Sequence, residues 1–171
     1  MEQRRPLFDN WPFMRGWEEL IGGDRFTYIE VGPSVSIIPI RRGANGKIEI
    51  VLIRERRIET SQPIVKSAGG FLRERSLEDG ARQIIFAETG IHCGQLYLLV
   101  PKMEGFTVID LPIATFIGLD WTMEKEGSAE RIIIPLSEAV DLVLKQEIPD
   151  QCNADAIMRL ALLEQLGRLP I

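Results

Sequence analysis

The sequence predicts an α/β or α+β sandwich in which a mixed sheet packs against helices. Two observations carry this prediction: short runs of β-branched and aromatic residues recur along the chain, and three segments place apolar residues at helical spacing. The 171 residues, of which 45% are hydrophobic, suffice for one domain with its own core. One helix is expected after the third strand, and two helices close the chain.

Strand-like patterns begin at Phe26. Runs rich in β-branched and aromatic residues are typical of strands when turn residues flank them. The pair Asn45-Gly46 favours a tight hairpin turn between the second run and the third. The expected strands cover residues 26–31, 35–40, 47–53, 95–100, 108–121 and 131–135.

Signals for both ends mark a helix from Ser76 to Gly90. Ser76 and Asp79 have the spacing of a capping box, and Gly90 stands where a left-handed residue ends a helix. Apolar residues recur between these ends at helical spacing.

The last two helices are expected at residues 135–146 and 154–166. Both segments carry apolar residues on one helical face. We expect Asn153 to be the N-cap of the second helix and Gly167 to end it.

Residues 1–25 are expected to form an arm, with the domain proper at 26–171. The arm mixes Pro6, Trp11 and Trp17 with charged residues. A tryptophan on an arm usually packs against the chain's own core or against a second subunit.

Composition argues against several classes of function. Twenty Lys and Arg against 25 Asp and Glu give a net charge of −5, which disfavours a surface for a nucleic-acid polymer or an anionic membrane. One His and two Cys argue against a zinc site, and a Ser-His-Asp triad would need His92 as its base. The longest stretch without a charge, residues 111–119, is too short to span a membrane. Since no disulfide framework is present, we expect a cytoplasmic protein.

Residues 67–91 hold the most informative motif. The motif consists of a Gly, a later Glu and then the pattern Arg-Glu-apolar-x-Glu-Glu-x-Gly-apolar. Counted from Gly69, this segment keeps the spacing of the motif, and Glu88 and Gly90 match its last Glu and its last Gly. It resembles the Nudix box, the loop–helix–loop signature of enzymes that hydrolyse nucleoside diphosphates linked to another group. If Gly70 opens the box instead, one loop residue is missing.

The likeness covers residues 26–166 and is to ADP-ribose pyrophosphatases in particular. Residues 51–57 and 67–70 resemble segments of these enzymes, with Ser67 where they have proline. The acidic loop within residues 124–136 resembles one that carries a catalytic glutamate there, and the closing helices also match. The resemblance implies the Nudix α/β/α sandwich with a mixed central sheet, a homodimer built with help from the arm, and a nucleotide diphosphate such as ADP-ribose as ligand.

The chemistry of the family depends on carboxylates that are mostly missing here. Family members hold Mg²⁺ on the box helix, because this ion favours oxygen ligands in a near-octahedral shell. Three positions that carry glutamate in the family are Arg75, Ile84 and Ala87 in this chain, which leaves Glu88 as the metal ligand. A guanidinium at residue 75 also repels a dication beside it. We therefore expect weak or absent Mg²⁺ binding.

The resemblance nominates further site residues. Catalytic roles are expected for Glu88 and for Glu126 or Glu130 of the acidic loop. The substrate-binding candidates are Arg54, Arg57, Arg75, Tyr28, Gly69 and Gly70. Arginine suits phosphate through its bidentate fork, and the one in the box could clamp a diphosphate in place of the metal. A structural role remains open for most of these residues. Glu88 could be bonded to the loop before its helix, and the two loop glutamates could be solvated. The arginines could form surface ion pairs, and Tyr28 could pack in a core or an interface.

Two hypotheses for function remain open. In the first, the chain is a catalytically impaired relative that binds a nucleotide diphosphate, or a protein partner, without efficient hydrolysis. In the second, it is a working pyrophosphohydrolase with a rearranged metal site, in which Glu88 is joined by Glu74, Glu78, Glu126 or Glu130. Divalent-metal binding separates the two, because only the second requires it.

Overall fold

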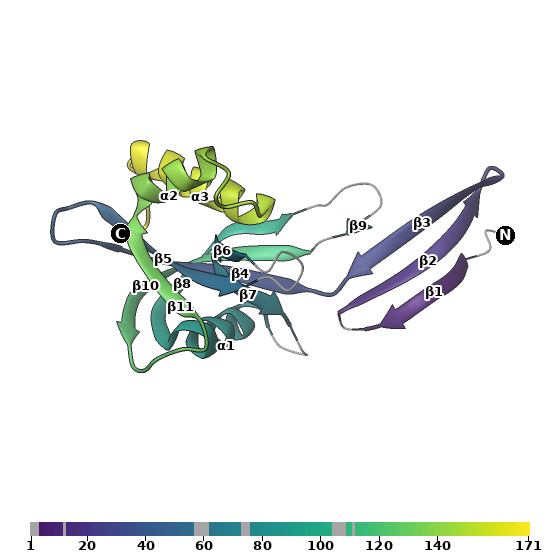
Figure 1. Ribbon diagram of the computed structural model, residues 1–171, viewed down its shortest axis with the longest axis horizontal. Coiled ribbons are helices and arrows are strands. Elements are labelled where there is room, and N and C mark those ends of the chain that lie inside the picture. The colour runs from purple at the N-terminus through teal and green to yellow at the C-terminus, as the bar shows by residue number, and fades with distance from the viewer. Residues whose placement is uncertain (1–3, 12, 57–61, 73–75, 104–108, 111) are drawn as a thin grey trace.

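The structure is a layered α/β/α sandwich from which a second, smaller sheet projects (Figure 1). It is a computed structural model that describes residues 4–11, 13–56, 62–72, 76–103, 109–110 and 112–171. Helix α1 (Leu77–Thr89) covers one face of the main sheet, whereas α2 (Leu136–Leu144) and α3 (Gln151–Gln165) cover the other. The mixed α/β class predicted from the sequence is confirmed.

The main sheet has seven strands and is split in its middle. Five of them follow the order β11-β5-β4-β10-β8, in which β4 and β10 are parallel and the other neighbours antiparallel. β4 and β5 pair through residues 40–42 and 48–50, next to the hairpin that joins them. Beyond these pairs the two strands are no longer bonded to each other. There β6 pairs with β5, and β7 pairs with β4, so that residues 63–71 fill the space between β4 and β5. The bounds are β4 (Ser34–Arg42), β5 (Ile48–Arg56), β6 (Pro63–Lys66), β7 (Ala68–Phe71), β8 (Ile91–Met103), β10 (Ile113–Met123) and β11 (Glu130–Pro135).

The predicted hairpin and the predicted first helix both form. Gly46 has a φ of 77°, and the Lys47 N–H donates to Asn45 Oδ1 at 3.0 Å. Ser76 is the N-cap of α1, because its Oγ accepts a hydrogen bond from the Asp79 N–H at 3.1 Å. Gly90 ends the helix in the left-handed conformation, as its sequence position predicts.

The last helix begins earlier than predicted. Asp150, and not Asn153, is the N-cap of α3, since Asp150 Oδ1 accepts from the Asn153 N–H at 3.0 Å. Both side chains suit an N-cap, so that the sequence pattern alone does not separate them. The Asn153 side chain is instead buried and bonded to Ser67, a contact that sequence spacing does not reveal.

The two faces of the main sheet bury separate apolar cores. Ile38, Ile50 and Leu52 point to the side covered by α2 and α3, whereas Ile37 and Val51 point to the side covered by α1. This alternation along a strand is what a sheet covered on both faces requires. None of the helices in the described ranges combines the length and the apolar character needed to cross a bilayer.

The expected arm is itself a sheet. β1 (Arg4–Asn10), β2 (Met14–Ile21) and β3 (Asp24–Val31) pair antiparallel, and β9 (Ile109–Asp110) adds to β3. The sequence predicts the first strand at Phe26, so strand structure extends further toward the N-terminus than predicted. Charged residues interrupt the apolar ones in this segment, which weakens the periodic signal of a strand.

We expect Ile85→Ala to lower the free energy of unfolding by roughly 2–5 kcal/mol, because it leaves a cavity beneath α1. The Ile85 side chain is 1% exposed and belongs to the core on that face. Ile133→Ala on β11 is the matched control, and since Ile133 is 38% exposed its truncation should cost well under half as much. Chemical denaturation measures both changes, and equal losses would contradict the placement of α1.

Candidate functional site

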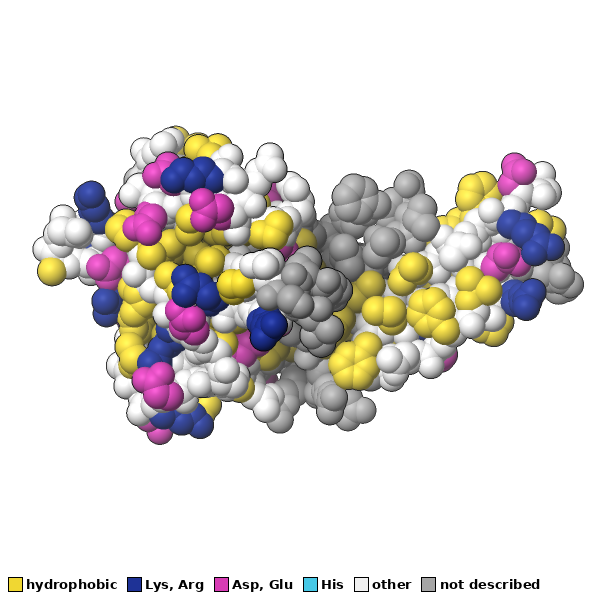
Figure 2. Space-filling view, in the orientation of Figure 1, with side chains coloured by type: hydrophobic (Ala, Val, Ile, Leu, Met, Phe, Trp, Pro, Cys, Tyr) yellow, Lys and Arg dark blue, Asp and Glu magenta, His cyan; other side chains and the backbone are white. Residues whose placement is uncertain are grey.

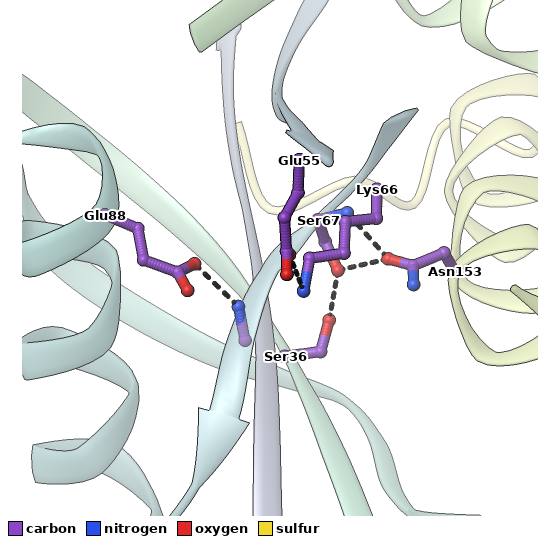
Figure 3. Close-up of polar contacts among 7 residues, drawn as sticks. Ser36, Glu55, Lys66, Ser67, Glu88 and Asn153 are labelled. Atoms are coloured by element: carbon purple, nitrogen blue, oxygen red, sulfur yellow. Dashed lines mark hydrogen bonds and ion pairs between the residues drawn. The ribbon is translucent and has the colours of Figure 1, made fainter. Parts of the chain in front are cut away.

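Glu88 is the centre of the candidate site. Its side chain leaves the last turn of α1, and Oε2 accepts a hydrogen bond from the Gly69 backbone N–H at 3.1 Å (Figure 3). Gly69 lies on β7, in the split of the main sheet. The bond to the loop before the helix, one of the two roles that the sequence left open for this carboxylate, is therefore present.

The surroundings of Glu88 favour its protonated form. Burial raises the pKa of this carboxyl above its usual value, and the negative charge of Glu55 acts in the same direction. The Lys66 ammonium and the hydrogen bond from Gly69 lower the pKa but do not cancel the effect of burial. A half-buried carboxyl with a shifted pKa beside a cation is typical of a functional site.

Lys66 brings the positive charge to this site. It lies at the end of β6, its side chain is 20% exposed, and its ammonium pairs with Glu55 on β5 at 2.5 Å (Figure 3). With Glu88 from α1, these residues form a cluster of two carboxylates and one ammonium, which we call the Glu88 cluster. Three different elements of the fold thus place one residue each in the cluster.

The acidic loop lies against the end of α1. The N–H groups of Ser128 and Ala129 donate to the carbonyl oxygens of Ala87 and Glu88 at 3.1 and 2.9 Å. A Cβ on Gly127 would lie 2.1 Å from the Glu88 carbonyl oxygen, so that a larger residue there would push the loop from the helix. The fold therefore holds this loop next to the turn that carries Glu88.

The two loop glutamates nominated by the sequence are engaged with arginines. Glu126 pairs with Arg131 at 2.9 Å, and Glu130 pairs with Arg54 at 2.6 Å. Their side chains are 89% and 60% exposed, so these are surface ion pairs of small energetic value. Within the described residues, no hydrogen bond or ion pair joins either glutamate to Glu88.

The described residues do not form a magnesium site. Mg²⁺ demands near-octahedral oxygen coordination, with carboxylates that are ionised. In the part of the chain that the structure describes, no three His, Cys, Asp or Glu side chains come close enough to hold a metal ion. Burial raises the pKa of Glu88, which opposes the ionised form that a metal ion needs, and its Oε2 already accepts from Gly69. The Mg²⁺ implied by the resemblance therefore does not fit these residues.

The remaining nominated residues fall in different places. Tyr28 lies on β3 of the smaller sheet, whereas Gly70 lies on β7 and pairs with β4 of the main sheet. Arg57 and Arg75 lie outside the described residues.

Sequence analysis missed Lys66 and a buried polar chain beside it. The Ser67 N–H donates to Asn153 Oδ1 at 2.7 Å, and Ser67 Oγ donates to the same oxygen. Ser36 Oγ lies 2.5 Å from Ser67 Oγ (Figure 3). The signal in the sequence is Ser67 itself, because a serine, unlike a proline, has an N–H and a hydroxyl that need partners once buried.

Comparison with known proteins supports the fold and goes no further. No protein-family model matches the chain, and no curated protein is similar to it in sequence. The crystal structure of an ADP compounds hydrolase superposes on it with a TM-score of 0.76. The superposition covers 99% of this chain and 96% of the hydrolase at 18% sequence identity. The chain therefore shares the fold of that hydrolase.

We expect Glu88→Gln to gain stability relative to the wild type as the pH rises. The pKa of Glu88 in the folded state is above its ordinary value of 4.5, so that the folded protein binds this proton more tightly than the unfolded chain does. The wild type therefore loses stability as the pH rises from about 4.5 through the folded value, whereas a Gln, which can still accept from Gly69, does not.

Melting temperatures from pH 4 to pH 8 measure this difference, with Glu147→Gln as the control on an exposed loop. The control should show no such trend. A difference between Glu88→Gln and the wild type that shrinks toward pH 8 would show that the ionised carboxylate is favoured by its surroundings.

Proposed function

We propose that this protein binds a nucleotide diphosphate such as ADP-ribose and hydrolyses it poorly or not at all. The observation that carries the proposal is the composition of the Glu88 cluster, in which an ammonium occupies the neighbourhood of the last box carboxylate. Hydrolysis of a pyrophosphate by this family depends on charge neutralisation by metal ions and on a delivered water. The described residues lack the carboxylates that would hold these metal ions.

Lys66 is the residue we assign to the phosphates. A protonated lysine acts as a point charge toward phosphate oxygens, and its present partner Glu55 is 47% exposed and can be displaced into water. A charge-assisted hydrogen bond of this kind contributes about 1.5–3 kcal/mol. The raised pKa of Glu88 makes protonation of this carboxyl easier, which lowers its repulsion of a phosphate.

The likeness to an ADP compounds hydrolase supports the choice of ligand. That protein's name refers to ADP compounds, and nearly all of this chain superposes on it. Function belongs to the site and not to the fold, so the ligand has to be tested on this chain.

A working pyrophosphohydrolase with a rearranged metal site is the second candidate. The observation that favours it is the loop at residues 126–130, which is bonded to the turn of α1 that carries Glu88. Both loop glutamates are exposed and would be free to turn if their ion pairs opened.

We expect ADP-ribose to bind equally well with Mg²⁺ and with EDTA, and to give no AMP under either condition. Lys66→Met should weaken binding roughly 10- to 100-fold, because it removes a charge-assisted contact, while Lys66→Arg keeps most of the affinity. Lys145→Met, on the exposed end of α2, is the matched control. Calorimetric titration and AMP release measure the two properties.

Turnover with Mg²⁺ or Mn²⁺ that disappears in Glu88→Gln would establish the second candidate instead. Absence of ADP-ribose binding in the wild type under every condition would reject both.

The proposal includes a homodimer formed through the smaller sheet. That sheet is a single layer that stands out from the sandwich, and apolar side chains line the face in view (Figures 1 and 2). Its exposed apolar residues are Leu7, Phe8, Trp11, Met14, Leu20, Ile21 and Phe26. A sheet buries its apolar face only against a second layer, and this chain supplies none there among its described residues. A second copy would supply it.

We expect the wild type to be a dimer and Leu20→Glu to weaken the dimer at least tenfold, because a charge would be buried at the interface. Leu20 is 47% exposed on β2. Leu162→Glu, at a residue 55% exposed on α3, is the control and should leave the dimer intact. Sedimentation velocity over a range of concentrations measures both, and a monomeric wild type would rule out the dimer.

A further inference from the structure

A separate pocket lies where β4 and β10 end, away from the Glu88 cluster. Its volume is about 400 Å³, which is within the range of small-molecule sites. At about 3.3 Å per residue, Arg42 lies roughly 20 Å along β4 from Ser36, the residue that pairs with Gly69. In Figure 1 the hairpin that follows Arg42 is at the end of the sandwich opposite to the smaller sheet. The walls are formed by residues 40–42, 119–121 and 170–171 and by Gln95.

Arg42 brings an unbalanced positive charge to this pocket. Its Nη1 donates to the Gly46 carbonyl oxygen at 2.9 Å, a neutral partner that holds the side chain at the turn of the hairpin. Within the described residues no carboxylate pairs with Arg42, and its Nε and Nη2 groups donate no hydrogen bond. The neighbouring Arg41 differs, because it pairs with Glu49 at 2.8 Å and lies over the ring of Trp121. Arg42 thus keeps the charge and the donors that suit a carboxylate.

Asp120 brings an unbalanced negative charge to the same pocket. Its Oδ2 accepts from Gln95 Nε2 at 3.0 Å, and the Tyr97 hydroxyl donates to Gln95 Oε1 at 2.8 Å, so that a neutral chain holds the carboxylate in place. In the part of the chain that the structure describes, no lysine or arginine pairs with Asp120, and its Oδ1 accepts no hydrogen bond. The carboxylate therefore keeps an oxygen for a cationic group.

The two charges line one pocket without neutralising each other. A single charged side chain at a surface is ordinary, since water solvates it. Here, however, neutral hydrogen-bond partners hold each charged group, and the two groups belong to neighbouring strands of one sheet. A ligand with one negative and one positive group would satisfy both. Because both side chains are already held, they would lose little conformational freedom when they bind it.

The pocket also has an apolar wall. Ile40 and Leu119 are 1% and 4% exposed, and they line it together with Pro170 and Ile171. Apolar area next to the two charged groups suits a ligand that carries an aliphatic group beside its own charges.

We propose that this pocket binds a free α-amino acid with an aliphatic side chain. The carboxylate of the ligand accepts from Arg42, its ammonium donates to Asp120, and its side chain packs against Ile40 and Leu119. Neither an inorganic anion nor a cation alone satisfies both charges. The residues of this pocket take no part in the Glu88 cluster, so that the proposal does not depend on nucleotide binding.

The indole N–H of Trp121, which lines the pocket, is the reporter. The chain has three tryptophans, and in a ¹⁵N–¹H correlation spectrum the Trp121 signal is identified by its loss in Trp121→Phe. We expect L-leucine to shift this signal in a saturable manner. L-alanine should bind more weakly, because its side chain covers less of the apolar wall. A Trp121 signal that leucine does not move would overturn the proposal.

Two derivatives of leucine separate its charged groups. N-acetyl-L-leucine keeps the carboxylate and lacks the ammonium, whereas L-leucinamide keeps the ammonium and lacks the carboxylate. Each should bind at least tenfold more weakly than leucine, because each loses one charge-assisted contact. If the acetylated compound bound as tightly as leucine, the pocket would be an anion site, and if leucinamide did, it would be a cation site. Either result would contradict an amino-acid site.

Variants test the two charged side chains separately. Arg42→Met removes the positive charge, and Asp120→Asn removes the negative one. Asn tolerates the left-handed φ of 49° at this position as Asp does, and it can still accept from Gln95. Each variant should weaken leucine binding at least tenfold.

Lys47→Met is the matched control. It removes an exposed positive charge from the same hairpin, at a residue that does not line the pocket, and should bind leucine like the wild type. Unchanged signals in the remainder of each spectrum show that a variant is folded. An equal loss of binding in Lys47→Met and Arg42→Met would reduce the effect to net charge and reject the site.

Discussion

The split between β4 and β5 is the constraint on which the polar interior depends. The two strands pair next to their hairpin and then diverge, and the segment at residues 63–71 fills the gap by pairing first with β5 and then with β4. The change of partner occurs at Ser67, whose backbone N–H has no strand to bond to. A buried N–H without an acceptor costs free energy, so that the fold must bring side chains to this place.

Two side chains from opposite layers accept hydrogen bonds from N–H groups of this segment. Asn153 on α3 accepts from Ser67, and Glu88 on α1 accepts from Gly69. The helices on the two faces of the sheet are thereby tied to one short segment. Glu88 therefore has a structural task whatever else it does.

Much of this architecture could be predicted from the sequence, and the parts that could not share a physical reason. The hairpin at Asn45-Gly46 and the helix from Ser76 to Gly90 depend on local signals, and both form as predicted. The bond between Ser67 and Asn153 spans 86 residues and has no local signal, so that the sequence predicts Asn153 to be a helix cap instead. Lys66 has no local signal either, because its ion pair with Glu55 depends on the pairing of β6 with β5, in which Lys66 lies opposite Ile53.

The charge state of Glu88 links the structural and the functional arguments. A metal ligand must give up its proton, and burial opposes this here, since it raises the pKa of the carboxyl. Binding of a phosphate group requires the reverse, because an approaching anion is repelled by a carboxylate and tolerated by a neutral carboxyl. Lys66 adds the positive charge that a phosphate needs and that would repel a dication. The charge of Lys66 favours an anionic ligand over a dication here, and the raised pKa of Glu88 acts in the same direction because it makes protonation of this carboxyl easier when an anion approaches.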